Sequence, residues 1–282
     1  MSHALFQSQL LQDQVAVITG GATGIGASIT QHLAQLGATV VIASRKEENI
    51  KAAAAGFSKM LQVPVYGIAC DIRDRDAVHN LVSKTLEQHG KIDLLVNNGG
   101  GQFFSAAQDI RPKGWDSVIA TNLTGTWNLI RETANQWMLK NGGKIVNITM
   151  LTDRGFPGMA HSCAARAGVE GLTKSLAVEW ANRNIKINCI QPGIIASSGM
   201  KNYPAGVAVA KSSQAEIPMK RLGTCDDIAH LVCFLASSAG EYITGQIWAV
   251  DGGRNLWGKT WPIPNPSKLP EVEIHQWPWD KR

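Results

Sequence analysis

The sequence predicts an α/β fold: a single domain built on a doubly wound parallel sheet with helices on both faces. Short runs of Val, Ile, Leu and Ala alternate with longer amphipathic stretches along most of the 282 residues. The short runs are apolar throughout, which is typical of strands that helices bury on both faces. The chain is long enough for one large core, and no linker of domain scale precedes residue 254.

The expected elements follow one another as βα units. The first is a strand at 15–18 and a helix at 25–36, with Gly37 placed where it can end the helix. Asp74 is of a residue type that caps helix N-termini. Further strands are expected at 39–43, 63–69, 92–96, 144–149, 185–190 and 247–250. Further helices are expected at 46–60, 74–89, 113–140, 161–181 and 226–236.

Composition excludes several classes of protein. Hydrophobic residues make up 44% and charged residues 17% of the chain, which excludes a largely disordered protein. No apolar run approaches ~18 residues, and the first residues lack a basic segment followed by an apolar core, so we expect neither a membrane span nor a secretory signal. The net charge of +5 is spread thinly, so neither nucleic acid nor a membrane surface is an expected partner.

The cysteine spacing argues against a metal site. None of the five cysteines forms a Cys-x-x-Cys pair, and zinc sites and disulfide frameworks depend on such regular spacing. We therefore expect no bound metal. Unpaired cysteines fit a reducing compartment, and the last residues, Asp280-Lys281-Arg282, differ from a peroxisomal Ser-Lys-Leu signal. The expected location is the cytoplasm.

A glycine-rich segment, Thr19-Gly20-Gly21-Ala22-Thr23-Gly24-Ile25-Gly26, lies between the first strand and the first helix. Glycines permit a tight turn and let the backbone approach a pyrophosphate. The helix N-terminus supplies free N–H groups and positive dipole charge. Such a unit predicts a Rossmann-like dinucleotide site. Its expected contacts come from Gly20, Thr23, Gly24, Ile25 and Gly26.

The end of the second strand indicates which dinucleotide binds. A carboxylate there would bind a ribose 2′-hydroxyl and repel a 2′-phosphate, but the residues are Ser44, Arg45 and Lys46. A guanidinium can bind a phosphate through paired hydrogen bonds, and a serine hydroxyl can add another. The sequence therefore predicts NADP(H).

The spacing Gly-x-x-x-Gly-x-Gly resembles that of the short-chain dehydrogenase/reductase family. Further motifs of this resemblance, which covers about residues 12–254, are Asn97-Asn98-Gly99-Gly100, Asn122-Leu123-Thr124-Gly125, Pro192-Gly193 and Asp251-Gly252-Gly253. The resemblance implies that Asp71 contacts the adenine edge and that Asn122 kinks the long helix. It also implies cofactor contacts from Ile72, Asn98, Gly99, Gly100, Arg166, Pro192, Gly193 and Ile195.

The catalytic motif departs from the family pattern. Where the family carries Tyr-x-x-x-Lys, this chain has Ser162 and Arg166, and Thr149 or Met150 stands where a serine is expected. A mechanism with a tyrosine proton donor therefore loses that donor. The three tyrosines lie elsewhere in the sequence, at Tyr66, Tyr203 and Tyr242.

Moving the motif along the helix to Glu170 and Lys174 does not restore it. The lysine would then lie about 18 Å along the axis from Ser162 and about 120° around it. We therefore expect Glu170 and Lys174 to form an i,i+4 ion pair on the surface.

The altered motif resembles that of 2,4-dienoyl-CoA reductases, and residues 97–103 and 161–169 resemble trans-2-enoyl-CoA reductases. This resemblance implies NADPH-dependent reduction of an unsaturated thioester, with an acyl-CoA as a small-molecule substrate. Charge that builds on the thioester oxygen needs hydrogen-bond donors. We expect Ser162 to donate, Arg166 to hold the nicotinamide ribose without titrating, and Thr149 with Asn122, or water, to relay a proton.

Three other functions stay open. The chain could be a ketone/alcohol oxidoreductase with a proton donor other than tyrosine, a cofactor-binding protein with little or no turnover, or a non-redox enzyme. The intact glycine loop disfavours the last of these. Residues 196–220 are expected to form a lid over the substrate.

Two surfaces are expected to be covered. Residues 255–282 contain five prolines and four tryptophans, so they cannot form a regular helix, and we expect them to pack on the body or on a neighbouring subunit. The helices that begin at Lys113 and His161 carry apolar residues on more than one face. The family resemblance implies that these helices pair across a two-fold axis, which predicts a homo-oligomer, a tetramer.

Overall fold

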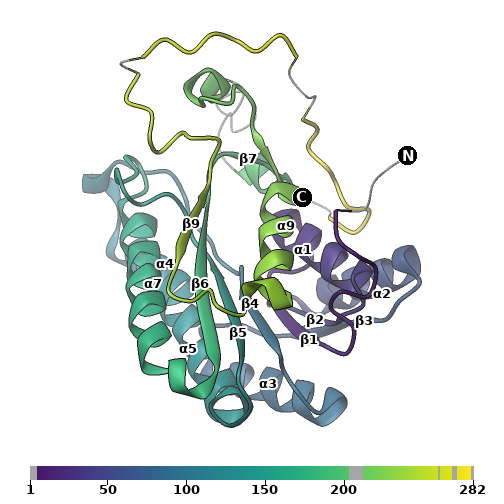
Figure 1. Cartoon of the computed structure of the whole chain (residues 1–282). Helices are drawn as coiled ribbons and strands as arrows, with labels where there is room; N and C mark the ends of the chain where they lie inside the picture. The colour runs from purple at the N-terminus through teal and green to yellow at the C-terminus, as the bar shows by residue number, and fades with distance from the viewer. Residues whose placement is uncertain (1–4, 203–211, 260, 269–271, 281–282) are drawn as a thin grey trace.

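The computed structural model describes residues 5–202, 212–259, 261–268 and 272–280 (Figure 1). Seven strands form one parallel sheet in the order β3-β2-β1-β4-β5-β6-β9, and a short second sheet pairs β7 with β8. The strands of the main sheet are β1 Val15–Thr19, β2 Thr39–Ser44, β3 Val65–Ala69, β4 Leu94–Asn97, β5 Gly143–Ile148, β6 Ile185–Pro192 and β9 Ile247–Val250. The predicted doubly wound parallel sheet is confirmed.

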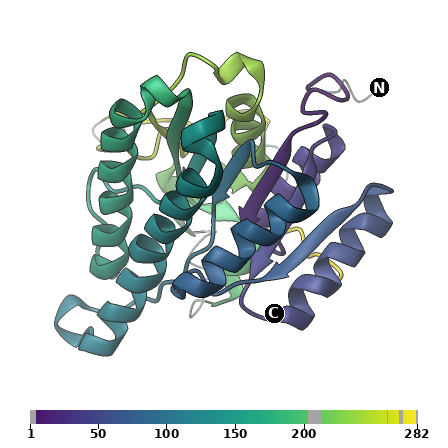
Figure 2. The same ribbon diagram turned by 90° about the horizontal axis from the view of Figure 1, so that it is seen from below.

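Helices cover both faces of the sheet (Figure 2). One face carries α1 Gly24–Gln35, α2 Glu47–Leu61 and α9 Cys225–Ala236. The other carries α3 Arg75–His89, α5 Gly125–Thr133 and α7 Ala160–Glu179, and α4 Pro112–Ile119 packs beside α7. The central strands β1, β2, β4, β5 and β6 bury most of their side chains because both faces are covered, which explains their apolar sequences, whereas the edge strands β3 and β9 are only partly buried.

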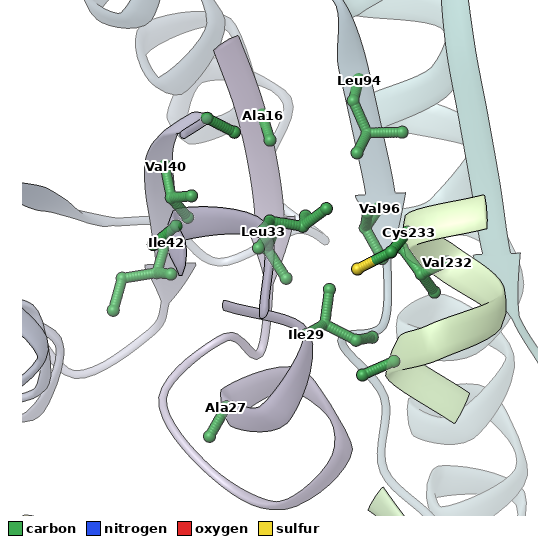
Figure 3. Close-up of a cluster of buried hydrophobic side chains, with 14 of the residues drawn as sticks. Ala16, Ala27, Ile29, Leu33, Val40, Ile42, Leu94, Val96, Val232 and Cys233 are labelled. Atoms are coloured by element: carbon green, nitrogen blue, oxygen red, sulfur yellow. The ribbon is translucent and has the colours of Figure 1, made fainter. Parts of the chain in front are cut away.

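The largest hydrophobic core lies between α1, α9 and the centre of the sheet (Figure 3). Ile29 and Leu33 on α1 meet Val232 and Cys233 on α9, and all four side chains are fully buried. At roughly 1.5–3 kcal/mol for each large apolar side chain that is buried, this packing fixes the direction in which α1 leaves the sheet. The start of α1 is therefore a rigid platform.

Local sequence explains where helices begin and end. The Asp74 carboxylate accepts hydrogen bonds from the backbone N–H groups of Asp76 and Ala77 (2.9 and 3.3 Å), as its predicted capping role requires. Thr224 and Asp227 form a capping box at the start of α9. Gly37 has φ +94° directly after α1, which only glycine adopts readily.

The long helix expected at 113–140 is not continuous. Two π-helical segments, Ala120–Thr124 and Ala134–Met138, interrupt it and separate α4, α5 and the short α6 Leu139–Asn141. The first of these segments contains Asn122, so the predicted break at this residue is confirmed. π-Helical turns widen the hydrogen-bonding ladder and occur often at functional sites.

Candidate active site

The carboxyl edge of the sheet gathers the loops that the sequence singled out, as expected for an open parallel sheet. The turn from β1 into α1 has Gly20 at φ +65° and Gly24 at φ +55°. A Cβ at Gly26 would lie 2.2 Å from the Gly20 carbonyl oxygen. Only glycine fits this position, so the backbone forms a tight cradle at the start of α1.

The start of α1 is open to an anion. Thr23 is the N-cap residue but makes no side-chain cap, and the first turn contains no acidic residue. The first backbone N–H groups of a helix have no partner within it, and they carry its positive dipole end. This terminus therefore fits a phosphate, in contrast to the capped starts of α3 and α9.

The loop after β4 is tied to this cradle. The Asn98 amide donates to the carbonyl oxygens of Thr19 and Gly20 (3.0 and 3.2 Å). The Thr19 hydroxyl accepts the backbone N–H groups of Asn98 and Gly99 (3.1 and 2.9 Å). The predicted Asn98, Gly99 and Gly100 therefore lie beside the glycine loop.

The residues expected at the adenosine end lie where β2 and β3 end. Ser44 is half-buried, and Arg45 and Lys46 are exposed. Two hydrogen bonds from the Arg73 guanidinium to the Asp71 carboxylate (2.6 and 2.9 Å) lower the pKa of that carboxyl group. Arg45 and Lys46 are therefore exposed cations near the Asp71–Arg73 ion pair.

Ile72 and the end of β6 complete the outline of the cofactor region. The Ile72 side chain is buried against Gly99 and Gly125. After Pro192 the Gly193 backbone N–H donates to Val250 (2.9 Å). Ile195 begins the two-residue strand β7 (Ile195–Ala196), which pairs with β8 (Gly223–Thr224). Next along the chain, Ser197 comes within 3.6 Å of the Cβ position of Gly24, so the expected lid begins against the glycine loop.

Three of the four expected catalytic residues meet in one place. The Asn122 amide donates to the Ser162 hydroxyl at 3.4 Å, and Ser162 donates to the Gln102 side-chain carbonyl at 2.7 Å. The Arg166 guanidinium lies against Gly100, with one terminal nitrogen 2.1 Å from the position that a Cβ would take. Ser162 and Arg166 are buried, so this is an enclosed polar site.

Asn122 fixes the loop that faces Ser162. Its side-chain oxygen accepts the Gly101 N–H (2.9 Å), and its amide donates to the Gly101 carbonyl (3.0 Å). Its own carbonyl accepts the Thr126 hydroxyl (3.0 Å). The π-helical turn thus frees Asn122 to bind a loop rather than only its own helix.

α7 is held close to this turn by a small residue. A Cβ at Gly168 would lie 3.0 Å from Leu123, which follows Asn122 directly. The absence of a side chain at Gly168 therefore lets the π-helical turn approach α7 closely.

Thr149 lies in a different network, centred on Glu170. The Thr149 hydroxyl is 3.0 Å from the Cys189 sulfur and 3.5 Å from the Glu170 carboxylate. Glu170 also accepts the Thr152 hydroxyl, which lies 2.8 and 3.0 Å from its two carboxylate oxygens, and the Gln191 amide (2.9 Å). Burial raises the pKa of Cys189 to about 12, so this thiol stays protonated.

The expected surface ion pair between Glu170 and Lys174 is wrong. Glu170 is only 9% exposed and faces the sheet, whereas Lys174 is exposed. The helical spacing correctly placed the two residues one turn apart. It could not show that Thr152 and Gln191, from the ends of β5 and β6, supply enough donors to bury the carboxylate.

Two residues of the site were not predicted. Gln102 accepts a hydrogen bond from Ser162, and the sequence of the loop around Gln102 contains no pattern that predicts this contact. His161 is fully buried with its ring 4.3 Å from that of Phe103, and its Nδ1 accepts the Ser162 backbone N–H (2.8 Å). A histidine directly before the serine was the available signal.

The tyrosines that the structure describes lie away from Ser162. Tyr66 is on β3, an edge strand of the sheet, and faces His89. Tyr242 is fully exposed. Tyr203, which the lid was expected to carry, lies outside the described residues. Met150, which with Thr149 was expected near the family's serine position, is buried.

The cradle at α1 and the polar site at α7 define a class, the dinucleotide-binding α/β proteins whose ligands lie at the carboxyl edge of the sheet. A family model described as enoyl-(acyl carrier protein) reductase matches residues 20–255. The chain belongs to the short-chain dehydrogenase/reductase family of oxidoreductases, whose members use nicotinamide cofactors.

Individual relatives agree with this assignment. The chain is 35% identical over 251 residues to a peroxisomal 2,4-dienoyl-CoA reductase of Danio rerio, a match that covers 88% of this chain and 84% of that one. It is 34% identical to a 3-oxoacyl-[acyl-carrier-protein] reductase of Thermotoga maritima, covering 86% and 98%. Among solved structures, a citronellol catabolism dehydrogenase of Pseudomonas aeruginosa is 36% identical with a TM-score of 0.80, covering 89% and 99%.

Proposed function

We propose that the protein is an NADPH-dependent reductase of an α,β-unsaturated acyl thioester such as an enoyl-CoA. The observation that carries this proposal is the buried Ser162 hydroxyl, held between Asn122 and Gln102 beside Arg166. The site offers hydrogen-bond donors and a fixed positive charge in place of a tyrosine. The similarity to a dienoyl-CoA reductase supports an acyl thioester as the substrate class.

The residues present fit a dinucleotide. The cradle of Gly20, Gly24 and Gly26 and the uncapped start of α1 would hold the pyrophosphate. Ser44, Arg45 and Lys46 would hold a 2′-phosphate, which is why we propose NADPH rather than NADH. Asp71, Ile72, Asn98, Gly99, Gly100, Pro192, Gly193 and Ile195 would line the remaining contacts. The cofactor, when bound, supplies the hydride.

The chain's own residues would stabilise the charge that forms on the substrate. Ser162 would donate to the thioester oxygen as it becomes enolate-like. Arg166 would hold the nicotinamide ribose and contribute a charge that does not titrate. We place the proton relay on Asn122 and solvent, with Thr149 in a supporting role through its contact with the Glu170 network.

One assay tests this proposal. NADPH consumption is measured with a 2-enoyl-CoA, a 2,4-dienoyl-CoA, a 3-oxoacyl thioester, a simple ketone and, with NADP⁺, an alcohol. We expect turnover with one of the unsaturated thioesters. Turnover confined to the 3-oxoacyl thioester or the ketone would instead favour the carbonyl reductase function, which the similarity to the Thermotoga maritima protein supports. If no substrate is turned over, the function that remains is that of a cofactor-binding protein with little or no turnover.

We further propose a cytoplasmic homotetramer with residues 196–220 as the substrate lid. No described helix is long and apolar enough to cross a membrane. Exposed apolar residues lie on the helices expected to pair, with Trp115 on α4 41% exposed and Val178 on α7 81% exposed. Two isologous contacts would generate closed symmetry. A monomer mass in light scattering at micromolar concentration would contradict the tetramer.

A further inference from the structure

The glycine loop is held by hydrogen bonds to four successive carbonyl groups. Asn98 donates to the carbonyl oxygens of Thr19 and Gly20 (3.0 and 3.2 Å). The Thr30 hydroxyl donates to that of Gly21 (3.0 Å). The fourth carbonyl, of Ala22, accepts the indole N–H of Trp279 (2.8 Å). Because each carbonyl is turned toward a protein donor, the loop keeps one backbone conformation.

The fourth donor differs from the others in its origin. Asn98 and Thr30 belong to the loop after β4 and to α1, but Trp279 lies 257 residues from Ala22 in the sequence. It belongs to the Pro- and Trp-rich segment that leaves β9, passes around the outside of the molecule and returns to α1 and α2 (Figure 1). The contact therefore joins the end of the described chain to its nucleotide loop.

The indole ring has a built seat on α2. Its atoms lie 2.2 Å from the position that a Cβ would take at Gly56, and its centroid is 4.4 Å from that of Phe57. Trp277, only 4% exposed, packs against Phe57 at 5.0 Å and stacks on Trp279 at 5.4 Å. Gly56 lies within a helix, where glycine is unfavourable, and its presence there makes room for the ring.

The same segment also contacts the lid. Val272 and Ile274 pack against a small apolar cluster that includes Met200, Ile217 and Leu222. Residues 272–279 of the segment thus contact both the expected lid and the glycine loop.

We propose that Trp279 is a positioning residue for dinucleotide binding, which holds the Ala22 carbonyl away from the phosphate site and so keeps the loop's N–H groups available to it. The proposal rests on the proposed cofactor site at the glycine loop. Trp279 acts on a part of the cofactor that NADPH and NADH share, so its loss weakens both equally.

The first test replaces Trp279 by Phe, which keeps the ring contact with Phe57 and removes the N–H. Binding of NADPH and of NADH is measured directly by calorimetry. We expect both dissociation constants to rise by up to about fivefold, because a loop that has lost a hydrogen bond worth about 1 kcal/mol must be ordered again on binding. Their ratio should stay unchanged. Trp261 is 74% exposed. Trp261→Phe is therefore the matched control and should bind both dinucleotides as the wild type does.

A second test reaches the same contact from α2. Gly56→Ala places a methyl group where the Trp279 ring lies, whereas Gly171→Ala on α7 meets nothing within 4 Å. We expect Gly56→Ala to weaken both dinucleotides as Trp279→Phe does, and to add nothing in a Trp279→Ala background. Gly171→Ala should leave binding unchanged.

The outcomes separate this proposal from the proposed function. If the wild type binds dinucleotide and both Trp279→Phe and Gly56→Ala bind it equally well, Trp279 has no positioning role. If the Trp279→Phe variant changes the ratio of NADPH to NADH affinity, it acts on the adenosine end and the proposal is wrong. If the wild type binds neither dinucleotide, the proposed function itself fails, and this inference fails with it.

Discussion

Two helices begin at the same edge of the sheet, and they build their sites by different means. At the start of α1 the site is backbone: glycine conformations, free N–H groups and carbonyls that protein donors hold in place. At the start of α7 the site is made of side chains, with Ser162, Asn122 and Gln102 in one chain of hydrogen bonds.

This difference determines what each region tolerates. A backbone cradle fails when any atom is added to it, as a Cβ at Gly26 would do. A side-chain network can lose one member and keep its fold, so it can change its chemistry without changing its architecture. Ser162 and Arg166, which the family resemblance would place at the positions of its tyrosine and lysine, both lie at this side-chain site.

The largest expected effect lies at α7. Ser162→Ala should lower kcat by about 10²–10³, as loss of a donor to a developing oxyanion does, while the affinity for NADPH stays unchanged. Steady-state kinetics with the enoyl thioester that the wild type turns over measures both. Full activity in Ser162→Ala would show that the proton or hydrogen-bond donor lies elsewhere.

The next effect concerns the cofactor end. Arg45→Ala should weaken NADPH binding by roughly 1–3 kcal/mol, the range for a charge-assisted hydrogen bond, and leave NADH binding almost unchanged. Calorimetric titration of both dinucleotides decides this. Tighter binding of NADH than of NADPH by the wild type would refute the cofactor assignment.

A smaller effect distinguishes a buried carboxylate from a surface ion pair. Glu170→Gln places amide hydrogens toward the donors Thr152 and Gln191, so it should lower the free energy of unfolding by about 1.5 kcal/mol. Lys174→Gln is the matched control on the exposed side of α7 and should change it by less than ~0.5 kcal/mol. Equal losses in urea denaturation of the two variants would support the ion pair instead.

The smallest effect comes from the junction of α1 and α9. Hydrogen bonds from His32 and Ser28 lower the pKa of Asp226 to about 2, against an ordinary value of 3.8. Because the pKa of Asp226 is lower in the folded than in the unfolded state, its ionised carboxylate stabilises the fold at pH values above about 4. This stabilisation is lost as the pH falls from about 4 through about 2. The Asp226 side chain is 59% exposed, so solvent screening limits the contribution to below ~1 kcal/mol.

The comparison of wild type with Asp226→Asn measures this contribution. The difference between their free energies of unfolding should be largest at neutral pH and vanish near pH 2. A difference that grows on acidification would assign the opposite sign to the group.

What could be predicted from the sequence follows the same division. The seven strands of the main sheet and most helices were placed within two residues, because uniformly apolar runs and caps such as Asp74 depend on local chemistry, whereas the two-residue strands β7 and β8 were not predicted. The glycine loop was predictable because its tight backbone conformation leaves no room for a side chain at the glycine positions. The partners of Glu170 and Ser162 were not, since Gln191 and Gln102 reach them from other strands and loops.

The interrupted helix at 113–140 is an intermediate case. The family resemblance implied a kink at Asn122, but it did not indicate that the helix is π-helical there or that the side chain binds Gly101. The sequence thus indicated that Asn122 is an unusual position in the helix, but it did not identify the residue that Asn122 binds.

The contact between Trp279 and Ala22 also has a consequence for the order in which a new protein matures. At about 5–20 residues per second, a ribosome needs roughly 13–50 s to travel the 257 residues between them. β1, α1 and the loop's local carbonyl contacts can form during that time, whereas the last one cannot.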